Sequence, residues 1–246
     1  MKLNLEPNVA DTEEYQHLGD KWQYLLDERY FQKQEELELS GGIRLVYRDY
    51  SQENGKVSYR ARRMSVLDGE HEIFHRDCLL DIGQIITHEI IHHQDGHRYL
   101  LLREELYGYT VINLDDRTQF RYIPQSLLRH QESFIWVIGH YNPKSNLLAV
   151  EGCYWACPYS TLVVDFSEPV PQDQSLPHRW LDLNDLLYEK EGEDKWDIED
   201  VCFVRWEEDG GITVKAEFYQ EEQGGHRQER TFSPEELYQL LRNASH

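Results

Sequence analysis

The feature that most restricts the fold is a series of short apolar segments, each bounded by turn-forming residues, between residues 95 and 170. Runs of about 4–8 apolar, β-branched and aromatic residues are typical of strands, and Gly, Pro, Asn and Asp between them are typical of turns. Breaks at Asn142-Pro143 and at Pro158 separate the later segments. The sequence therefore predicts a meander built from HRYLLLREE, YGYTVINLDD, TQFRYIP, SFIWVIGHYN, NLLAVEGCYW and STLVVDFS.

The six segments form two similar triplets, each closing near an aspartate (Asp115 and Asp165), and the repeat length of about 40 residues is that of propeller blades. A meander of this size buries its faces only by stacking on its neighbours. The predicted fold is mainly β, with antiparallel meanders stacked in a small or incomplete propeller-like arrangement and a helix at each end.

The N-terminal helix is predicted over residues 11–40, and Gly41-Gly42 ends the pattern. Apolar residues recur there at three- and four-residue spacing, at Tyr15, Leu18, Trp22, Leu25 and Leu26. Near the other end, Ser233 suits an N-cap, Pro234 the first helical position and Glu236 a capping box. A shorter helix is predicted at LNDLLYEKE.

Two further hairpins are predicted outside the meander, at Asn54-Gly55 and at Asp209-Gly210, because these dipeptides accept the positive φ of tight hairpin turns. The first turn places Ile43, Leu45 and Tyr47 on one face with Met64 and Val66, and the second places Val201 and Phe203 with Val214, Ala216 and Phe218. We therefore divide the chain into an N-terminal helical segment (1–40), a β-meander core (41–170) and a C-terminal hairpin plus helix (171–246) packed on the same domain.

The segment HEIIH, His88 to His92, matches the zinc-protease signature H-E-x-x-H. That motif needs a helix, on which residues i and i+4 lie side by side and the Glu activates a metal-bound water. On a strand the same two residues lie about 13 Å apart. Six of the ten residues from 82 to 91 are β-branched, which disfavours helix.

A hairpin turn at Asp95-Gly96 is predicted to follow this strand and to pair His92 with Tyr99, Ile90 with Leu101 and His88 with Arg103. The extended form is our prediction, with no metal or other cofactor. The alternative is a zinc-dependent hydrolase in which His88 and His92 bind zinc and Glu89 is the base. The Gly and His of the longer zinc signature would fall at Asp95 and Arg98, so no third ligand is at a standard distance.

Three other groups of reactive side chains were weighed. Six histidines lie within 27 residues, and we expect them to pack against tyrosines and carboxylates, with a metal site or a pH response as the alternative. Cys153 and Cys157 are expected to be free, buried thiols, although either could be a nucleophile. Four carboxylates near the meander could form an acid–base pair, a weak signal among 46 acidic residues: Glu104, Glu105, Glu151 and Asp165.

The composition limits the choice of partner. Forty-six acidic residues against 25 Lys and Arg give a formal charge of −21, which repels phosphate backbones and anionic lipids. Nucleic acid and membranes are therefore not expected as partners. No secretory signal and no apolar run of about 20 residues is visible, so we predict a cytoplasmic location.

The strings DG, LYGY, YIP, FIW, YNP, NLLAV, GCYWACP and DFS occur in this order over about residues 95–169. In these strings the chain resembles an uncharacterised family of bacterial cytosolic proteins, and YNPKSNLLAV also resembles the start of a WD-type propeller blade. The resemblance implies an architecture but no known activity and no catalytic residues.

The function predicted from these features is a cytosolic binding or scaffold protein with an unidentified protein or small-molecule partner. Exposed aromatic residues and strand-connecting loops of the meander would hold the partner. The candidate binding residues are Tyr107, Tyr109, Trp155 and Tyr159.

Overall fold

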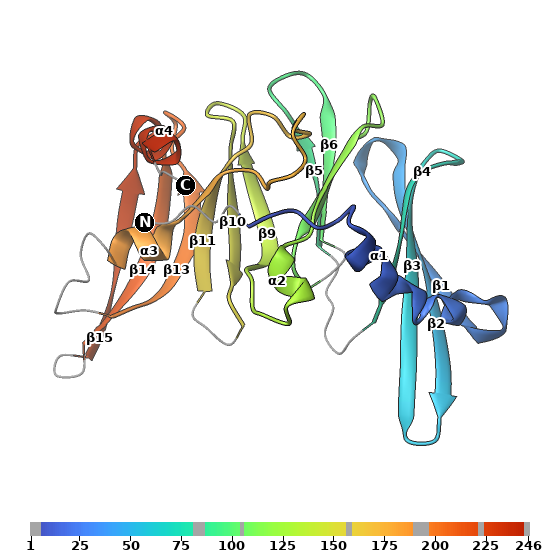
Figure 1. Ribbon diagram of the computed structural model, residues 1–246. Helices are drawn as coiled ribbons and strands as arrows, with labels where there is room; N and C mark the ends of the chain where they lie inside the picture. The colour runs from blue at the N-terminus through green and yellow to red at the C-terminus, as the bar shows by residue number, and fades with distance from the viewer. Residues whose placement is uncertain are drawn as a thin grey trace.

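The computed structural model describes residues 6–80, 87–103, 106–155, 159–188, 197–220 and 224–243. In these residues the chain is mainly β, arranged in four antiparallel sheets that follow one another in a row, from β1–β4 on the right of Figure 1 to β13–β15 on the left. No helix in this described part is long and apolar enough to cross a membrane.

The first sheet has the strand order β1-β2-β3-β4. Its strands are β1 (Phe31–Glu38), β2 (Ile43–Asn54), β3 (Val57–Asp68) and β4 (His71–Leu79). The predicted shared face of its long hairpin is confirmed, since Leu45 pairs with Val66 and Tyr47 with Met64. The turn itself lies one residue later than predicted, at Gly55-Lys56, because Asn54 pairs with Val57.

The predicted helix over residues 11–40 is confirmed only in its first part. Helix α1 covers Glu13–Asp20, two short 3₁₀ helices (Gln23–Leu26 and Glu28–Tyr30) follow, and Phe31–Glu38 is strand β1. All of β1 is exposed, and it pairs along its length with β2. The ladder of backbone hydrogen bonds to β2 outweighs the helix propensity of its Glu, Gln and Lys residues.

The second and third sheets contain all six predicted meander strands. The second has the order β5-β6-β7-β8 and the third β12-β11-β10-β9, with the short helix α2 (Gln125–Leu128) between them. The strands are β5 (Thr87–His92), β6 (Arg98–Arg103), β7 (Tyr109–Asn113), β8 (Gln119–Tyr122), β9 (Ile135–Asn142), β10 (Leu147–Cys153), β11 (Tyr159–Asp165) and β12 (Trp180–Asp182).

The fourth sheet has the order β13-β14-β15, and two helices accompany it. Val201 pairs with Ala216 and Phe203 with Val214, as the predicted hairpin requires. The elements are α3 (Leu183–Leu187), β13 (Asp197–Trp206), β14 (Ile212–Gln220), β15 (Gly224–Phe232) and α4 (Pro234–Asn243). The predicted Ser233 cap of α4 is confirmed, since the Glu236 amide donates to its hydroxyl.

Three apolar cores lie between consecutive sheets. Strand β6 shows how the sequence produces them: Tyr99 and Leu101 point into the core shared with the third sheet, while Leu100 and Leu102 point into the core shared with the first. Because alternate side chains of a strand point to opposite faces, both faces of β6 are buried, which is why its residues 99–102 are all apolar. Among the described residues, no apolar cluster joins the first sheet to the fourth.

The pairing of β5 with β6 differs by one residue from the prediction. Ile91 pairs with Tyr99 and Glu89 with Leu101, because the connection has three residues, Gln94 to Gly96, and not two. The His93 amide donates to the His97 carbonyl (3.0 Å), and Gly96 takes a φ of 90°. A shift of one residue exchanges the two faces of a strand, so Glu89 shares its face with Leu101.

Candidate functional site

The H-E-x-x-H segment is strand β5, as predicted. His88 and His92 share one strand face at a separation of about 13 Å along the backbone, and they therefore cannot hold one ion as the two histidines of a helix do. In the described residues no group of three His, Cys, Asp or Glu side chains is placed to hold a metal ion. Glu89, the residue that the zinc alternative assigned as base, points from the other face.

The four aromatic residues predicted to bind a partner divide into two pairs. Tyr107 and Tyr109 are buried, so their predicted exposure is wrong. Tyr109 stacks on Trp136 with 4.0 Å between ring centroids and donates a hydrogen bond to Nδ1 of His178 (2.7 Å). Trp155 and Tyr159 are exposed, as predicted, at the end of the third sheet where β10 ends and β11 begins.

The other reactive side chains have ordinary partners. The buried His93 packs on Tyr99 and Tyr141, which agrees with the predicted packing of the histidine cluster. Cys78, Cys153 and Cys202 form no disulfide bond, and Cys157 lies outside the described residues. Of the four carboxylates, Glu151 contacts His140, Asp165 accepts from Ser167, and Glu104 and Glu105 lie outside the described residues.

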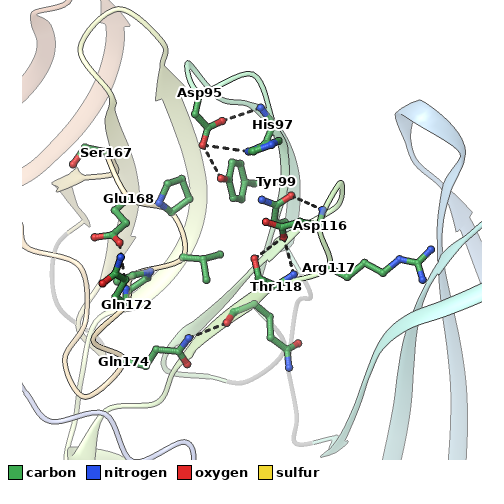
Figure 2. A pocket seen from close by; sticks show the side chains of 15 residues that line it. Asp95, His97, Tyr99, Asp116, Arg117, Thr118, Ser167, Glu168, Gln172 and Gln174 are labelled. Carbon is green, nitrogen blue, oxygen red and sulfur yellow. Dashed lines mark hydrogen bonds and ion pairs between the residues drawn. The ribbon is translucent and has the colours of Figure 1, made fainter.

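One hollow opens where hairpin ends of the second sheet meet the segment 167–174, and we call it the hairpin-end groove (Figure 2). Its volume is about 650 Å³. Tyr99 donates to Asp95 (2.7 Å), and Thr118 donates to Asp116 (2.6 Å) and lowers the pKa of that carboxyl. The carboxylates of Asp95 and Asp116 already accept hydrogen bonds from neighbouring side chains, so they are less available to a ligand.

A second hollow lies between the second and third sheets, near the opposite end of β6, and we call it the inter-sheet cavity. Its volume is about 430 Å³, within the usual range for small-molecule sites. Most of its surface is apolar. It is lined by Thr87, His88, Glu89, Leu101, Leu102, Arg103, Tyr109, Trp136, Val137, Ile138, Gly139 and Val150.

Glu89 is the acidic residue of this cavity. Its Oε2 atom is buried and has no hydrogen-bond partner. Burial raises the pKa of Glu89 above its ordinary value, and the nearby His140 opposes this effect. A buried carboxylate oxygen without a hydrogen-bond partner is costly to the fold, and a ligand that donates a hydrogen bond to it would remove that cost.

The absence of a side chain at Gly139 leaves room for the carboxylate of Glu89. A Cβ at position 139 would lie 3.2 Å from Oε2 of Glu89 and 3.1 Å from Leu101 Cδ2. Strand β9 also carries a bulge beside this residue, since Glu151 pairs with Ile138 but Gly152 pairs with Trp136. The bulge brings Trp136 and Gly139 to one face although they are three residues apart.

The basic residues near Glu89 either interact with other groups or are uncharged at neutral pH. Arg103 is buried and takes part in another polar or electrostatic contact, although its Nε atom itself makes no hydrogen bond. His140 holds Glu151 (2.9 Å) and stacks on Phe203. Burial lowers the pKa of His88, which keeps that ring uncharged at neutral pH.

Comparison with known proteins finds no family model, no curated protein and no solved structure that matches the chain. The resemblance to an uncharacterised bacterial family therefore stays a prediction.

Several lining residues were not predicted from the sequence, above all Arg103, Trp136 and Gly139. One signal was present: a glycine within an otherwise apolar strand often marks a bulge or a close approach. Gly139 in FIWVIGHYN is such a residue. The H-E-x-x-H pattern does point to Glu89, but for a role as catalytic base that requires a helix.

Proposed function

We propose that the protein is a binding protein that holds a small molecule, or a side chain of a protein partner, in the inter-sheet cavity. The observation that carries the proposal is the combination of an apolar hollow of about 430 Å³ with one buried carboxylate oxygen that lacks a partner. Ligand sites are commonly apolar with a few well-placed polar groups. The hairpin-end groove lacks this combination, because its carboxylates accept bonds from their own turns.

The predicted aromatic residues support a larger contact area around the cavity. The charge of Arg103, which lines the cavity, slightly opposes the rise in the pKa of the exposed Tyr159, so this ring lies within electrostatic range of the cavity lining. Trp155 is exposed in the same connection between β10 and β11. A protein partner would contact these two rings while one of its side chains enters the cavity.

The architecture in this proposal is a propeller-like stack with an open end. Three of the sheets are four-stranded meanders, and the apolar cores join consecutive sheets. Blades of a propeller bury their faces in the same way. Ligand sites between blades would then occur where two consecutive sheets separate, which is where the inter-sheet cavity lies.

Saturation-transfer NMR with indole-3-ethanol tests the proposal. We expect transfer with the wild-type protein and its loss in Gly139→Leu, which fills the cavity. Gly225→Leu is the matched control, because Gly225 is exposed on β15 and a Cβ there meets only ordinary contacts. Equal transfer in wild type and Gly139→Leu, with both proteins folded by circular dichroism, would contradict a site in this cavity.

A further inference from the structure

The charges of the inter-sheet cavity select its ligand. Three buried polar atoms in its lining have no hydrogen-bond partner: Nδ1 of His88, Oε2 of Glu89 and Nε of Arg103. The Arg103 side chain also takes part in another contact, and His88 is uncharged at neutral pH, so the carboxylate of Glu89 is the charge that a ligand can best pair with. A ligand that brings a positive charge would therefore pair with the buried carboxylate oxygen of Glu89. A ligand that brings a negative charge would add a second anion beside Glu89.

We propose that the inter-sheet cavity binds a ligand that carries a protonated amine on an apolar body, with the ammonium group paired to the Glu89 carboxylate. This inference rests on the proposed function and names the ligand class for the same site. The ammonium group donates hydrogen bonds to the carboxylate, and such charge-assisted bonds are stronger than neutral ones.

The apolar body of the ligand would lie on the hydrophobic part of the lining. Leu101 and Val150 come from the inner strands of the two sheets, Trp136 and Ile138 come from β9, and all four line the cavity. An aromatic or branched aliphatic group of moderate size fits this surface. The indole ring is a suitable probe because it is an aromatic group of moderate size with a flat apolar face.

The charge of the whole chain favours the same ligand class. The formal charge of −21 attracts cations to the surface and raises their local concentration. Long-range attraction is weakened by salt, whereas a contact inside a partly dry cavity is weakened much less. The preference for an amine should therefore persist at physiological ionic strength.

The test is isothermal titration calorimetry at neutral pH with three indoles that differ in the end of a short side chain. Tryptamine carries an ammonium, indole-3-ethanol a hydroxyl and indole-3-propionate a carboxylate. We expect tryptamine to bind at least about tenfold more tightly than indole-3-ethanol, which corresponds to about 1.4 kcal/mol. Indole-3-propionate should bind most weakly.

Glu89→Gln keeps the size of the side chain and removes its charge. It should remove the tenfold preference for tryptamine and leave the affinity for indole-3-ethanol within about twofold. Glu36→Gln is the matched control, since it makes the same charge change on the exposed strand β1 and should keep the preference. Melting curves of both variants establish that they are folded.

The pH dependence gives a second readout. Tryptamine affinity should fall as pH decreases through the pKa of Glu89, whose basic neighbours are Arg103, His88 and His140. The affinity for indole-3-ethanol should stay nearly constant over the same range. A preference for tryptamine with no pH dependence would contradict pairing with Glu89.

The outcomes separate the two proposals. Equal binding of the three indoles, or an amine preference that survives in Glu89→Gln, would overturn the ligand class while the cavity remains a binding site. Failure of all three indoles to bind would overturn the proposed function and this inference with it.

Discussion

At the residue scale, the carboxylate of Glu89 is expected to lower the stability of the unliganded fold, because the same unpaired oxygen is the one proposed to bind the ligand. Its buried Oε2 atom has no partner, and burial raises the pKa of its carboxyl. Removing the charge should therefore stabilise the unliganded protein, as is common for groups kept for function.

We predict that Glu89→Gln raises the free energy of unfolding at pH 7 by roughly 0.5–1 kcal/mol, a modest figure because the side chain is partly exposed. A carboxyl whose folded pKa is raised destabilises the fold above that pKa and stops doing so below its unfolded pKa. The gain should thus shrink as pH falls from 7 toward 4. Urea unfolding across this range measures it, and a constant gain at every pH would argue against a titrating Glu89.

His178 should affect stability in the opposite direction, since its contribution to the free energy of unfolding decreases as pH falls. It is buried, its Nδ1 accepts from Tyr109 and its Nε2 donates to the Glu168 carbonyl, and burial lowers its pKa to about 4. The stability from the neutral ring is complete above about pH 6.5 and is lost as pH falls toward 4, by up to about 3 kcal/mol.

The variant His178→Gln should flatten this part of the stability–pH curve, measured by urea unfolding at half-unit steps of pH. The exposed His71 at the start of β4 provides the control, and His71→Gln should leave the curve unchanged. An unaltered slope in His178→Gln would assign the acid sensitivity to other groups.

At the scale of the element, turns decide which face each side chain occupies. The first hairpin turns one residue later than predicted, which moves its strand pairing by two residues, so each side chain stays on its predicted face. The three-residue loop from Gln94 to Gly96 moves the pairing of β5 and β6 by one residue, so side chains of β5 lie on the opposite face from the predicted one relative to β6. The prediction that places Ile90 opposite Leu101 was wrong for this reason. Loop length cannot be determined from an Asp-Gly pair alone.

Gly96 tests the three-residue loop. Its φ of 90° is unfavourable for other residues, although a Cβ there would meet no atom within 4 Å. We predict that Gly96→Ala lowers the free energy of unfolding by about 1–2 kcal/mol through backbone strain alone. Gly19→Ala, equally uncrowded but within α1, should leave stability unchanged or raise it by up to about 1 kcal/mol. Equal effects of the two substitutions would contradict the loop conformation.

At the scale of the whole molecule, strands were predicted more successfully than their stacking. Continuous apolar runs such as the one in HRYLLLREE identify strands buried on both faces, and all six meander segments are strands. The sequence could not reveal that β1 is an edge strand, because its polar residues favour helix and only its pairing with β2 makes it extended. Nor could it reveal the cavity, which depends on the β9 bulge near Gly139 and on how the second and third sheets pack against each other.

The central claim is that β5 and β6 are extended and that one of their faces, with Leu101 and Glu89, borders a cavity shared with the third sheet. Methyl NMR of protein labelled at Ile, Leu and Val during titration with tryptamine tests it most directly. We predict large shifts for Leu101, Ile138 and Val150, which line the cavity, and little change for Leu100, which points into the core shared with the first sheet. Equal shifts for Leu100 and Leu101, or shifts confined to residues outside this lining, would contradict the account.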